Sequence, residues 1–511
     1  MRSLRAWLIP DVALAAAAVT LAYCLVVWDG PRRLFRDADS GWHIRTGERI
    51  LAHYRLPKED PYSFSRAGQP WIAWEWGADV LMGLAHGRAG LGGVAWLYAC
   101  AIAATVWMWF RLSWQAGGDF LLACAMAAPM LSTANLHWLA RPHVFGWIFT
   151  LAAVCYAERG GLRFRSRDAL CVAAGSALWA NVHGSFFLGP FITLVYAAGH
   201  WLRPRLWQED EASAREAGLR ARWFLLASMV SLAGTLVNPY GWRLHRHVAA
   251  YLTDSELLAR IGEFQSFNFH AEGAGQILLA VGLAGLGACV ALHQRRLAHF
   301  LLISLLLAAS LRMARGLPLL ALIGLPLTNG AVTAALRRAA AGASLRAGLR
   351  RRLQGFLEYS ARLRALDSDH HGGLVAIGVA IAALLWMVSP AAAARTGFPP
   401  DQFPVAAAAV IEKLPEQARL LSTDKFGGYL IYRFAGARKV FFDGRSDFYG
   451  AEFLKQYGRL MQARPGWRRQ VDEFGFTHAL LPNDYSLLGV LEETGWRRLY
   501  ADGVATLLVR P

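Results

Sequence analysis

Long apolar runs separated by short polar segments are the main pattern along this chain. About eleven runs approach the ~20 residues that cross a ~30 Å hydrocarbon core, at roughly 8–28, 92–112, 119–134, 142–158, 168–183, 185–202, 222–238, 275–292, 297–311, 314–334 and 374–390. The pattern predicts an α-helical polytopic membrane protein with about eleven transmembrane helices. Val27-Trp28-Asp29 replaces the small residues of a signal cleavage site, so we expect the first run to remain as an anchor.

Arginine-rich segments fall in alternate loops, at 159–167, 203–222, 295–296 and 337–364. The positive-inside rule then places these loops and the N-terminus in the cytoplasm of a bacterial inner (plasma) membrane. The predicted organisation is a bundle over 1–336 with a first external loop at 29–91, a basic cytoplasmic linker at 337–373 and a last span at 374–390. Residues 391–511 are expected to form a periplasmic or extracellular domain.

The last 110 or so residues change to a strand and helix pattern. We expect strands at Arg419–Thr423, Lys439–Phe442 and His478–Leu481, and a hairpin of Trp496–Ala501 with Val504–Val509 around Asp502-Gly503. Helices are expected after Gly427-Gly428, near 450–462 and near 486–494. Such alternation predicts a small C-terminal α/β domain.

Composition agrees with a membrane protein, because 55% of the residues are hydrophobic and only 17% are charged. The net charge of +17 lies in the loops, so no nucleic-acid partner is expected. The six cysteines all lie in apolar segments without metal-ligand spacing, which predicts neither disulfides nor a zinc site.

Asp37-Ala38-Asp39 follows the first apolar run directly. Two such carboxylates suit a divalent cation, Mg2+ or Mn2+, that keeps positions open for a substrate phosphate. The alternative is a solvated loop with helix-capping carboxylates. Glu75, between Trp74 and Trp76, is a candidate general base or sugar-binding group, since burial beside indoles raises a carboxyl pKa. The alternative for Glu75 is an aromatic belt at the membrane interface.

Other unusual polar residues lie near the external ends of the predicted helices, where ionisable groups are costly and usually mark function. The candidates for substrate binding are His43, Arg141, His143, Asn181, His183, Arg312 and Arg315. The arginines suit a lipid phosphate, which a guanidinium binds in bidentate fashion. Structural hydrogen bonding for the histidines and snorkelling for the arginines remain the alternatives.

Two loops of the C-terminal domain also carry candidates for substrate binding. Asp424 follows one predicted strand, and Asp443 with Arg445 follows the next. Loops that leave the carboxyl ends of neighbouring strands commonly build a site. An ion pair of Arg445 with Asp443 or Asp424 is the alternative.

These features together resemble the GT-C superfamily of polytopic glycosyltransferases, which use polyprenyl-phosphate-linked sugars. That superfamily carries a D-x-D-like motif in its first external loop, and Asp37-Ala38-Asp39 stands in that place. The resemblance implies metal-binding or catalytic roles for these two aspartates. The C-terminal domain is similar, more loosely, to that of the oligosaccharyltransferase catalytic subunit, but Asp424-Lys425-Phe426-Gly427 lacks the tryptophans and the tyrosine of its W-W-D-Y-G motif.

The resemblance and the polar residues together predict a membrane glycosyltransferase that moves a sugar from a polyprenyl-phosphate-linked donor to an envelope acceptor. Asp37, Asp39 and Glu75 are the expected catalytic groups, and membrane lipid and the donor lipid are the expected partners. Three alternatives stay open: a metal-independent ligase or polymerase of lipid-linked glycans, a lipid or glycan transporter (flippase), and a non-catalytic scaffold.

Overall fold

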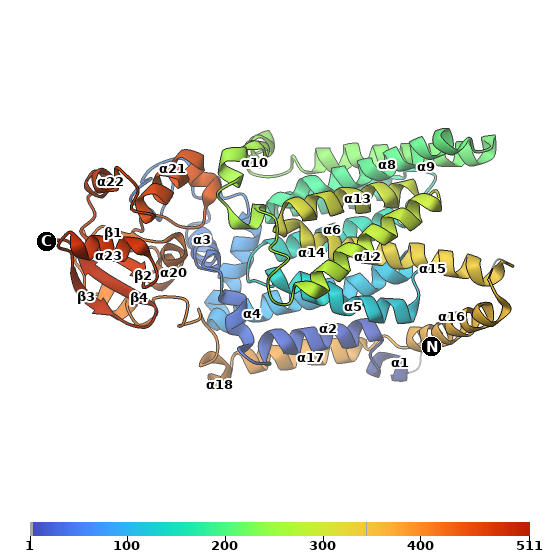
Figure 1. Cartoon of the computed structure of the whole chain (residues 1–511), viewed down its shortest axis with the longest axis horizontal. Helices are drawn as coiled ribbons and strands as arrows, with labels where there is room; N and C mark the ends of the chain where they lie inside the picture. Colours follow the sequence, from blue (N-terminus) through green and yellow to red (C-terminus); the bar gives the residue numbers. More distant parts are fainter. Residues whose placement is uncertain (1–3, 344) are drawn as a thin grey trace.

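The computed structural model describes residues 4–343 and 345–511, which form a helical bundle and a small C-terminal domain at one end of it (Figure 1). We call this end of the bundle the capped end and the opposite end the far end. The helices of the bundle are α1 (Leu4–Leu8), α2 (Val12–Leu25), α3 (Asp39–His53), α4 (Trp76–Gln115), α5 (Phe120–Ala134), α6 (His143–Ala157), α7 (Ser166–Val182), α8 (Leu188–Trp207), α9 (Glu211–Gly234), α10 (Trp242–Thr253), α11 (Ser255–Leu258), α12 (Ala274–His293), α13 (Leu297–Arg312), α14 (Leu317–Leu319), α15 (Leu325–Ala341), α16 (Ala347–Ser368), α17 (Gly373–Met387) and α18 (Pro390–Ala393). Short turns of 3-10 helix join several of them, and a π-helical turn at Leu320–Gly324 precedes α15.

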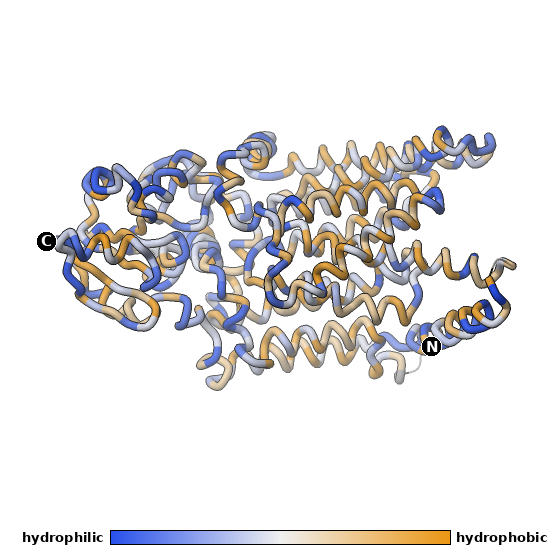
Figure 2. Tube along the Cα trace, in the orientation of Figure 1, coloured by the Kyte–Doolittle hydropathy of each residue, from blue (hydrophilic) through white to orange (hydrophobic). Residues whose placement is uncertain are grey.

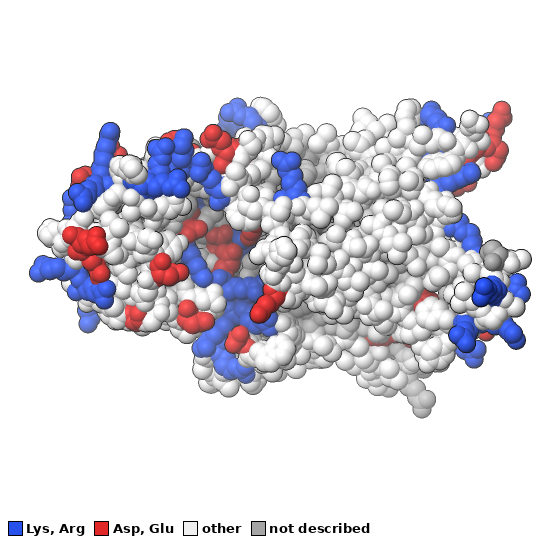
Figure 3. Space-filling view, viewed as in Figure 1, with Lys and Arg blue, Asp and Glu red and all other residues white. Residues whose placement is uncertain are grey.

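The bundle is the membrane-spanning part of the molecule. Apolar residues run along its helices (Figure 2), and the visible face between the two charged ends is almost free of lysine, arginine, aspartate and glutamate (Figure 3). Among the described residues, six helices are long and apolar enough to cross a membrane, or up to seven if the bent pair α16 and α17 is one span. Each of the predicted apolar ranges is largely helical, although 314–334 is divided among a 3-10 turn, α14, the π-helical turn and α15. The chain is therefore a multi-pass membrane protein, and the count of eleven spans stays a prediction.

The predicted first external loop, 29–91, is largely helical. It contains α3, which ends at Tyr54 in the left-handed conformation, and the first turns of α4. The apolar run 92–112 is only the second part of α4, since the backbone of Ala89 and Gly90 leaves helical geometry between the two parts. Gly90 has a φ of +56°, which glycine adopts without steric cost. The polar first part of α4 can therefore pack against α3 while the second part spans the bundle.

The C-terminal domain is an α/β unit, as predicted. Its sheet has the order β1-β2-β4-β3, with β1 parallel to β2 and the other pairs antiparallel. Its elements are α19 (Ala408–Ile411), β1 (Leu420–Ser422), α20 (Asp424–Arg433), α21 (Ser446–Met461), α22 (Trp467–Phe474), β2 (His478–Pro482), α23 (Ser486–Glu493), β3 (Arg497–Ala501) and β4 (Ala505–Val509). The predicted hairpin is the pair β3 and β4, and α22 was not predicted.

The strand predicted at Lys439–Phe442 is wrong. Val440 instead forms an isolated parallel bridge with Ser63, which belongs to the segment between α3 and α4. The Val440 N–H donates to the Tyr62 carbonyl at 3.0 Å, and the Phe64 N–H donates to the Val440 carbonyl at 3.0 Å. The segment is extended because it pairs with a distant part of the chain and not with the sheet. This pairing fixes the C-terminal domain to the capped end.

Candidate active site

The segment before α3 is fixed to the loop between α5 and α6. The Ala140 N–H donates to the Leu34 carbonyl at 2.8 Å, and the Ser40 hydroxyl donates to the Ala140 carbonyl at 2.9 Å. Arg36 donates to the carbonyl groups of Asn135 and Leu136, just beyond α5, at 3.0 and 2.9 Å. These bonds satisfy backbone groups of both segments and hold the acidic pair of the first beside Arg141 of the second.

Arg141 is the centre of an acidic cluster at the capped end. Its guanidinium lies 2.8 Å from each of three carboxylates, those of Asp37, Asp39 and Glu263. Arg315 adds a longer contact to Glu263, at 3.5 Å. Burial alone would lower the pKa of Arg141, but the carboxylates outweigh burial and raise that pKa well above its ordinary value. Burial would raise the pKa of Glu263, yet Arg141 and Arg315 hold it below its ordinary value.

Burial and the charge of Arg141 act on the pKa of Asp39 in opposite directions. Asp39 opens α3, and its N–H donates to Asp37 Oδ1 at 2.9 Å. Trp42 Nε1 donates to Asp39 Oδ1 at 3.2 Å. Burial raises the pKa of Asp39 to about 7, although Arg141 acts in the opposite direction. A carboxyl group with such a pKa can exchange a proton near neutral pH.

The C-terminal domain forms a wall of this cluster. Gly444 lies directly against the carboxylate of Asp39, where there is no room for a Cβ. Gly428 of α20 packs in the same way against Ala38, and Gly41 of α3 packs against the backbone of Gly428. Glycine at these positions lets two backbones approach closely. The acidic cluster is therefore enclosed between the bundle and the domain.

A second cluster surrounds Glu75, the residue before α4. Its carboxylate lies 3.3 Å from His183 Nε2 and 3.7 Å from His43 Nε2. His43 Nδ1 in turn lies 2.6 Å from Asp79 Oδ1, one turn into α4. Burial raises the pKa of Glu75 to about 7, with Arg315 and Arg141 acting in the opposite direction. Burial also lowers the pKa of His43 well below its ordinary value, so this imidazole is neutral.

Helix α3 joins the two clusters. Asp39 and His43 are four residues apart and share one face of the helix. Trp42 donates to Asp39 and lies with its ring centroid 3.5 Å from that of His43. The acidic cluster around Arg141 and the cluster around Glu75 are thus connected through α3. Such a site can accept a proton from a hydroxyl group and stabilise an anion.

The other predicted residues of the bundle take different places. His143 is buried, and its Nε2 lies 2.7 Å from the His137 carbonyl. Asn181 accepts a hydrogen bond from Trp76 Nε1 at 3.0 Å and donates to carbonyls of α7 and of the segment after α9, which is a structural role. Arg312 is exposed and has no ion pair among the described residues, whereas Arg315 reaches Glu263.

The predicted residues of the C-terminal domain separate as well. Asp424 is exposed at the start of α20, the helix that packs on α3. Arg445 is buried and donates to both carboxylate oxygens of Asp443, each at 2.7 Å. It also lies 2.8 Å from Asp60 of the segment between α3 and α4. The ion-pair alternative for Arg445 and Asp443 is therefore present, and it ties the domain to the bundle.

Two residues of the site were not among the predicted site residues. Asp79 lies four residues after Glu75, and an aspartate near the start of a long apolar helix is a signal that could have indicated it. Glu263 is an acidic residue of the loop before α12, but nothing in its surroundings in the sequence indicates that it reaches Arg141. Glu263 and Arg141 are far apart in the sequence, so no local pattern indicates their contact.

The metal role predicted for Asp37 and Asp39 stays a prediction. Oxygen ligands of this type do suit Mg2+ or Mn2+. However, the carboxylates of Asp37, Asp39 and Glu263 each lie on the guanidinium of Arg141. Within 4–343 and 345–511, no group of three or more His, Cys, Asp or Glu side chains is arranged to hold a metal ion. A divalent cation would have to displace Arg141, which already supplies positive charge there.

No protein-family model matches the chain, and no curated protein matches it in sequence. Among solved structures, the chain is similar to the oligosaccharyltransferase of Archaeoglobus fulgidus, crystallised in complex with Zn and sulfate. The identity is 10%, the TM-score is 0.55, and the match covers 92% of this chain and 68% of that one.

A second solved structure is ArnT from Cupriavidus metallidurans bound to undecaprenyl phosphate, with 13% identity, a TM-score of 0.46 and 97% of each chain covered. Both are glycosyltransferases of the GT-C type. At these identities the likeness concerns the fold. The likeness to the oligosaccharyltransferase therefore confirms the fold that the resemblance to GT-C glycosyltransferases predicted.

Proposed function

We propose that this protein is a membrane glycosyltransferase that moves a sugar from a polyprenyl-phosphate-linked donor to a hydroxyl group of an envelope acceptor. The observation that carries the proposal is the site at the capped end, where α3 joins the Glu75 cluster to the carboxylates on Arg141. The fold shared with an oligosaccharyltransferase supports it. In a bacterial cell this site would lie on the outer face of the inner membrane, since the arginine-rich loops lie at the far end.

The general base in this proposal is Glu75. Its carboxylate is buried and faces His43 and His183, and its pKa of about 7 suits proton transfer at neutral pH. Glu75 takes the proton of the acceptor hydroxyl as its oxygen forms a bond to the anomeric carbon of the sugar. The bond between that carbon and the phosphate oxygen breaks, and polyprenyl phosphate leaves with both bonding electrons.

The leaving phosphate needs positive charge that is not already neutralised. Arg315 is the more available guanidinium, because its one carboxylate contact is 3.5 Å long and its side chain is 31% exposed. Arg141 is held by three carboxylates and therefore acts as a positioning residue for Asp37 and Asp39. A bidentate guanidinium contact with phosphate would stabilise the charge that develops as the donor bond breaks.

Metal-independent transfer is the form of the reaction that the site favours. The specific observation is the guanidinium of Arg141 among the carboxylates that would otherwise hold a cation. A ligase or polymerase of lipid-linked glycans would use the same groups, and the acceptor distinguishes it from a transferase of single sugars. The transporter alternative stays a prediction.

Replacement of Glu75 by Gln tests the proposal. The variant keeps the shape of the side chain but cannot take a proton, so turnover should fall by roughly 10²–10⁴-fold, the usual contribution of a general base. The readouts are the polyprenyl-phosphate sugars that accumulate in cells and the release of polyprenyl phosphate by purified protein. Glu272→Gln, an exposed residue of the loop before α12, is the control. An E75Q protein that folds normally and leaves the lipid-linked sugars unchanged would contradict the proposal.

A further inference from the structure

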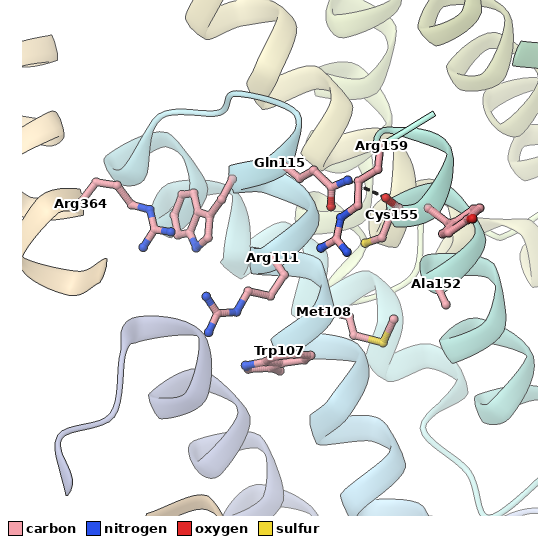
Figure 4. A pocket seen from close by; sticks show the side chains of 10 residues that line it. Trp107, Met108, Arg111, Gln115, Ala152, Cys155, Arg159 and Arg364 are labelled. Atoms are coloured by element: carbon pink, nitrogen blue, oxygen red, sulfur yellow. Dashed lines mark hydrogen bonds between the residues drawn. The ribbon is translucent and has the colours of Figure 1, made fainter. Parts of the chain in front are cut away.

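A basic cavity lies at the far end of the bundle, away from the site described above. It has a volume of about 710 Å³ and is lined by the last turns of α4, the end of α6 and one residue of α16. Figure 4 shows its three arginines, Arg111 on α4, Arg159 just beyond α6 and Arg364 on α16. Trp107 and Met108 form part of an apolar wall. The cavity therefore combines cations with a surface that suits hydrocarbon.

Several hydrogen-bond donors of this cavity are unused. Arg111 uses one Nη in an ion pair with Asp11 at 2.8 Å, but its Nε–H is buried without a partner among the described residues. The indole N–H of Trp114 is also buried without a hydrogen-bond partner among the described residues. Arg364 lies over the Trp114 ring at 4.5 Å and pairs with Asp367, and Arg159 has no ion pair in the described part of the chain. Buried N–H groups normally have an acceptor, so these donors indicate a missing one.

A second basic cavity, of about 690 Å³, adjoins the first. The two share Tyr156 and Arg159 among their lining residues. The second adds Arg163, Arg165 and Arg167, whose only neighbouring carboxylate in its lining is Asp168. Asp168 already accepts from the Tyr156 hydroxyl at 2.8 Å and from the backbone that caps α7. The paired cavities therefore carry a clear surplus of positive charge.

The location of the paired cavities points to a lipid and not to a soluble anion. They lie where α4 and α6 leave the part of the bundle whose visible face carries almost no charge (Figure 3). Guanidinium groups bind phosphate in bidentate fashion, and tryptophan is favoured at the level of lipid head groups. Basic pockets between membrane helices at such an interface bind lipids with several phosphates.

We propose that the paired cavities bind the head group of a phospholipid that carries two phosphates, of the cardiolipin class. One phosphate binds beside Arg111 and Arg364, the other binds beside Arg163, and Arg159 lies between them. The acyl chains follow the apolar wall formed by α4 and α6. The proposal does not rest on the transfer reaction, since the site of that reaction lies at the capped end.

The test uses purified full-length protein in detergent and follows its thermal unfolding midpoint and its lipid adducts by native mass spectrometry. Cardiolipin should raise the midpoint of the wild type and remain bound, whereas phosphatidylcholine should not. The double variant Arg159→Gln with Arg163→Gln removes one arginine that lines both cavities and one that lines only the second. Its half-saturating cardiolipin concentration should rise by at least about tenfold, as expected when charge-assisted hydrogen bonds are removed.

The matched control is Arg351→Gln with Arg352→Gln, which removes two exposed arginines of α16 that line neither cavity. This protein should bind cardiolipin as the wild type does. Both double variants should unfold at the wild-type midpoint without lipid, because neither pair of arginines makes an ion pair with another described residue. Equal cardiolipin binding by all three proteins would overturn the proposal. Full stabilisation by sodium pyrophosphate would also overturn it, because the cavities would then recognise a free anion.

Discussion

Arg141 determines the state of the acidic residues at the capped end. A single guanidinium holds two aspartates of the α3 segment and Glu263 of a loop more than a hundred residues later. Each carboxylate is only partly exposed, so its charge would be costly without this partner. The guanidinium of Arg141 thus supplies positive charge to these carboxylates from the protein itself.

We therefore expect turnover to be insensitive to chelators. Purified protein treated with EDTA should keep its rate, and elemental analysis should find less than one metal ion per chain. Arg141→Gln should lower turnover strongly, because Asp37 and Asp39 lose the group that positions them. A stoichiometric Mg2+ or Mn2+ whose removal stops turnover would show that a cation displaces the guanidinium.

The raised pKa of Glu75 predicts a pH dependence. A general base must be ionised, and with a pKa of about 7 only a small part of Glu75 is ionised at pH 6, whereas most of it is at pH 8. Turnover should therefore rise by roughly tenfold from pH 6 to pH 8. The measurement is the initial rate under saturating donor across this range. A rate that falls or stays constant over these pH values would exclude Glu75 as the base.

At the scale of the elements, a buried ion pair of the C-terminal domain connects it to the bundle. Arg445 is 1% exposed, and it binds Asp443 after the segment 439–442 and Asp60 before the bridge at Ser63. Its guanidinium also lies over the ring of Trp71, at 4.7 Å. One side chain thus joins the domain, the segment between α3 and α4, and an indole near Glu75.

Arg445→Met should loosen this connection. The substitution leaves two buried carboxylates without a cation, which costs about 3–5 kcal/mol in proteins generally. We expect a lower unfolding midpoint and faster cleavage of the C-terminal domain by added protease. Arg469→Met is the control, because its ion pair with Glu473 is largely exposed and should contribute little. Equal midpoints for the two variants would mean that other contacts hold the domain.

The elements show which parts of the fold are encoded locally. Every predicted apolar range is largely helical, since a hydrophobic run and its capping residues depend on neighbours in the chain. Lys439–Phe442 reads as a strand for the same local reasons, but its hydrogen-bond partner is Ser63. Hydrogen-bond partners that lie far apart in the sequence leave no local sequence pattern. In the site, Glu75 and Asp39 were predicted from their own surroundings, whereas the contact of Glu263 with Arg141 depends on the packing of a distant loop.

At the scale of the whole molecule, the site and the basic cavities occupy opposite ends of the membrane-spanning part. The visible face between them carries almost no charge (Figure 3). Apart from Arg111 of α4, the arginines that line the cavities belong to the loops that predicted a cytoplasmic far end. The uneven distribution of arginine between the two ends therefore predicts the orientation of the protein in the membrane, which can be measured directly.

We expect a cysteine at position 484 to be labelled from outside intact spheroplasts by an impermeant maleimide. Asp484 is exposed in the C-terminal domain, and Arg352 is exposed on α16 at the far end. In a cysteine-free background, Asp484→Cys should react before lysis and Arg352→Cys only after it. The reverse pattern would place the site in the cytoplasm and would remove the case for an envelope acceptor.

The bridge between Ser63 and Val440 has a consequence for biosynthesis. The segment after α3 leaves the ribosome early, and the segment around Val440 that it pairs with leaves it late. Phe64 packs into the aromatic core of the C-terminal domain, so residues 391–511 synthesised alone would lack part of their interior. The acidic cluster can be enclosed only once translation is nearly complete, and a nascent chain that stalls before α20 would leave Asp37 and Asp39 open to water.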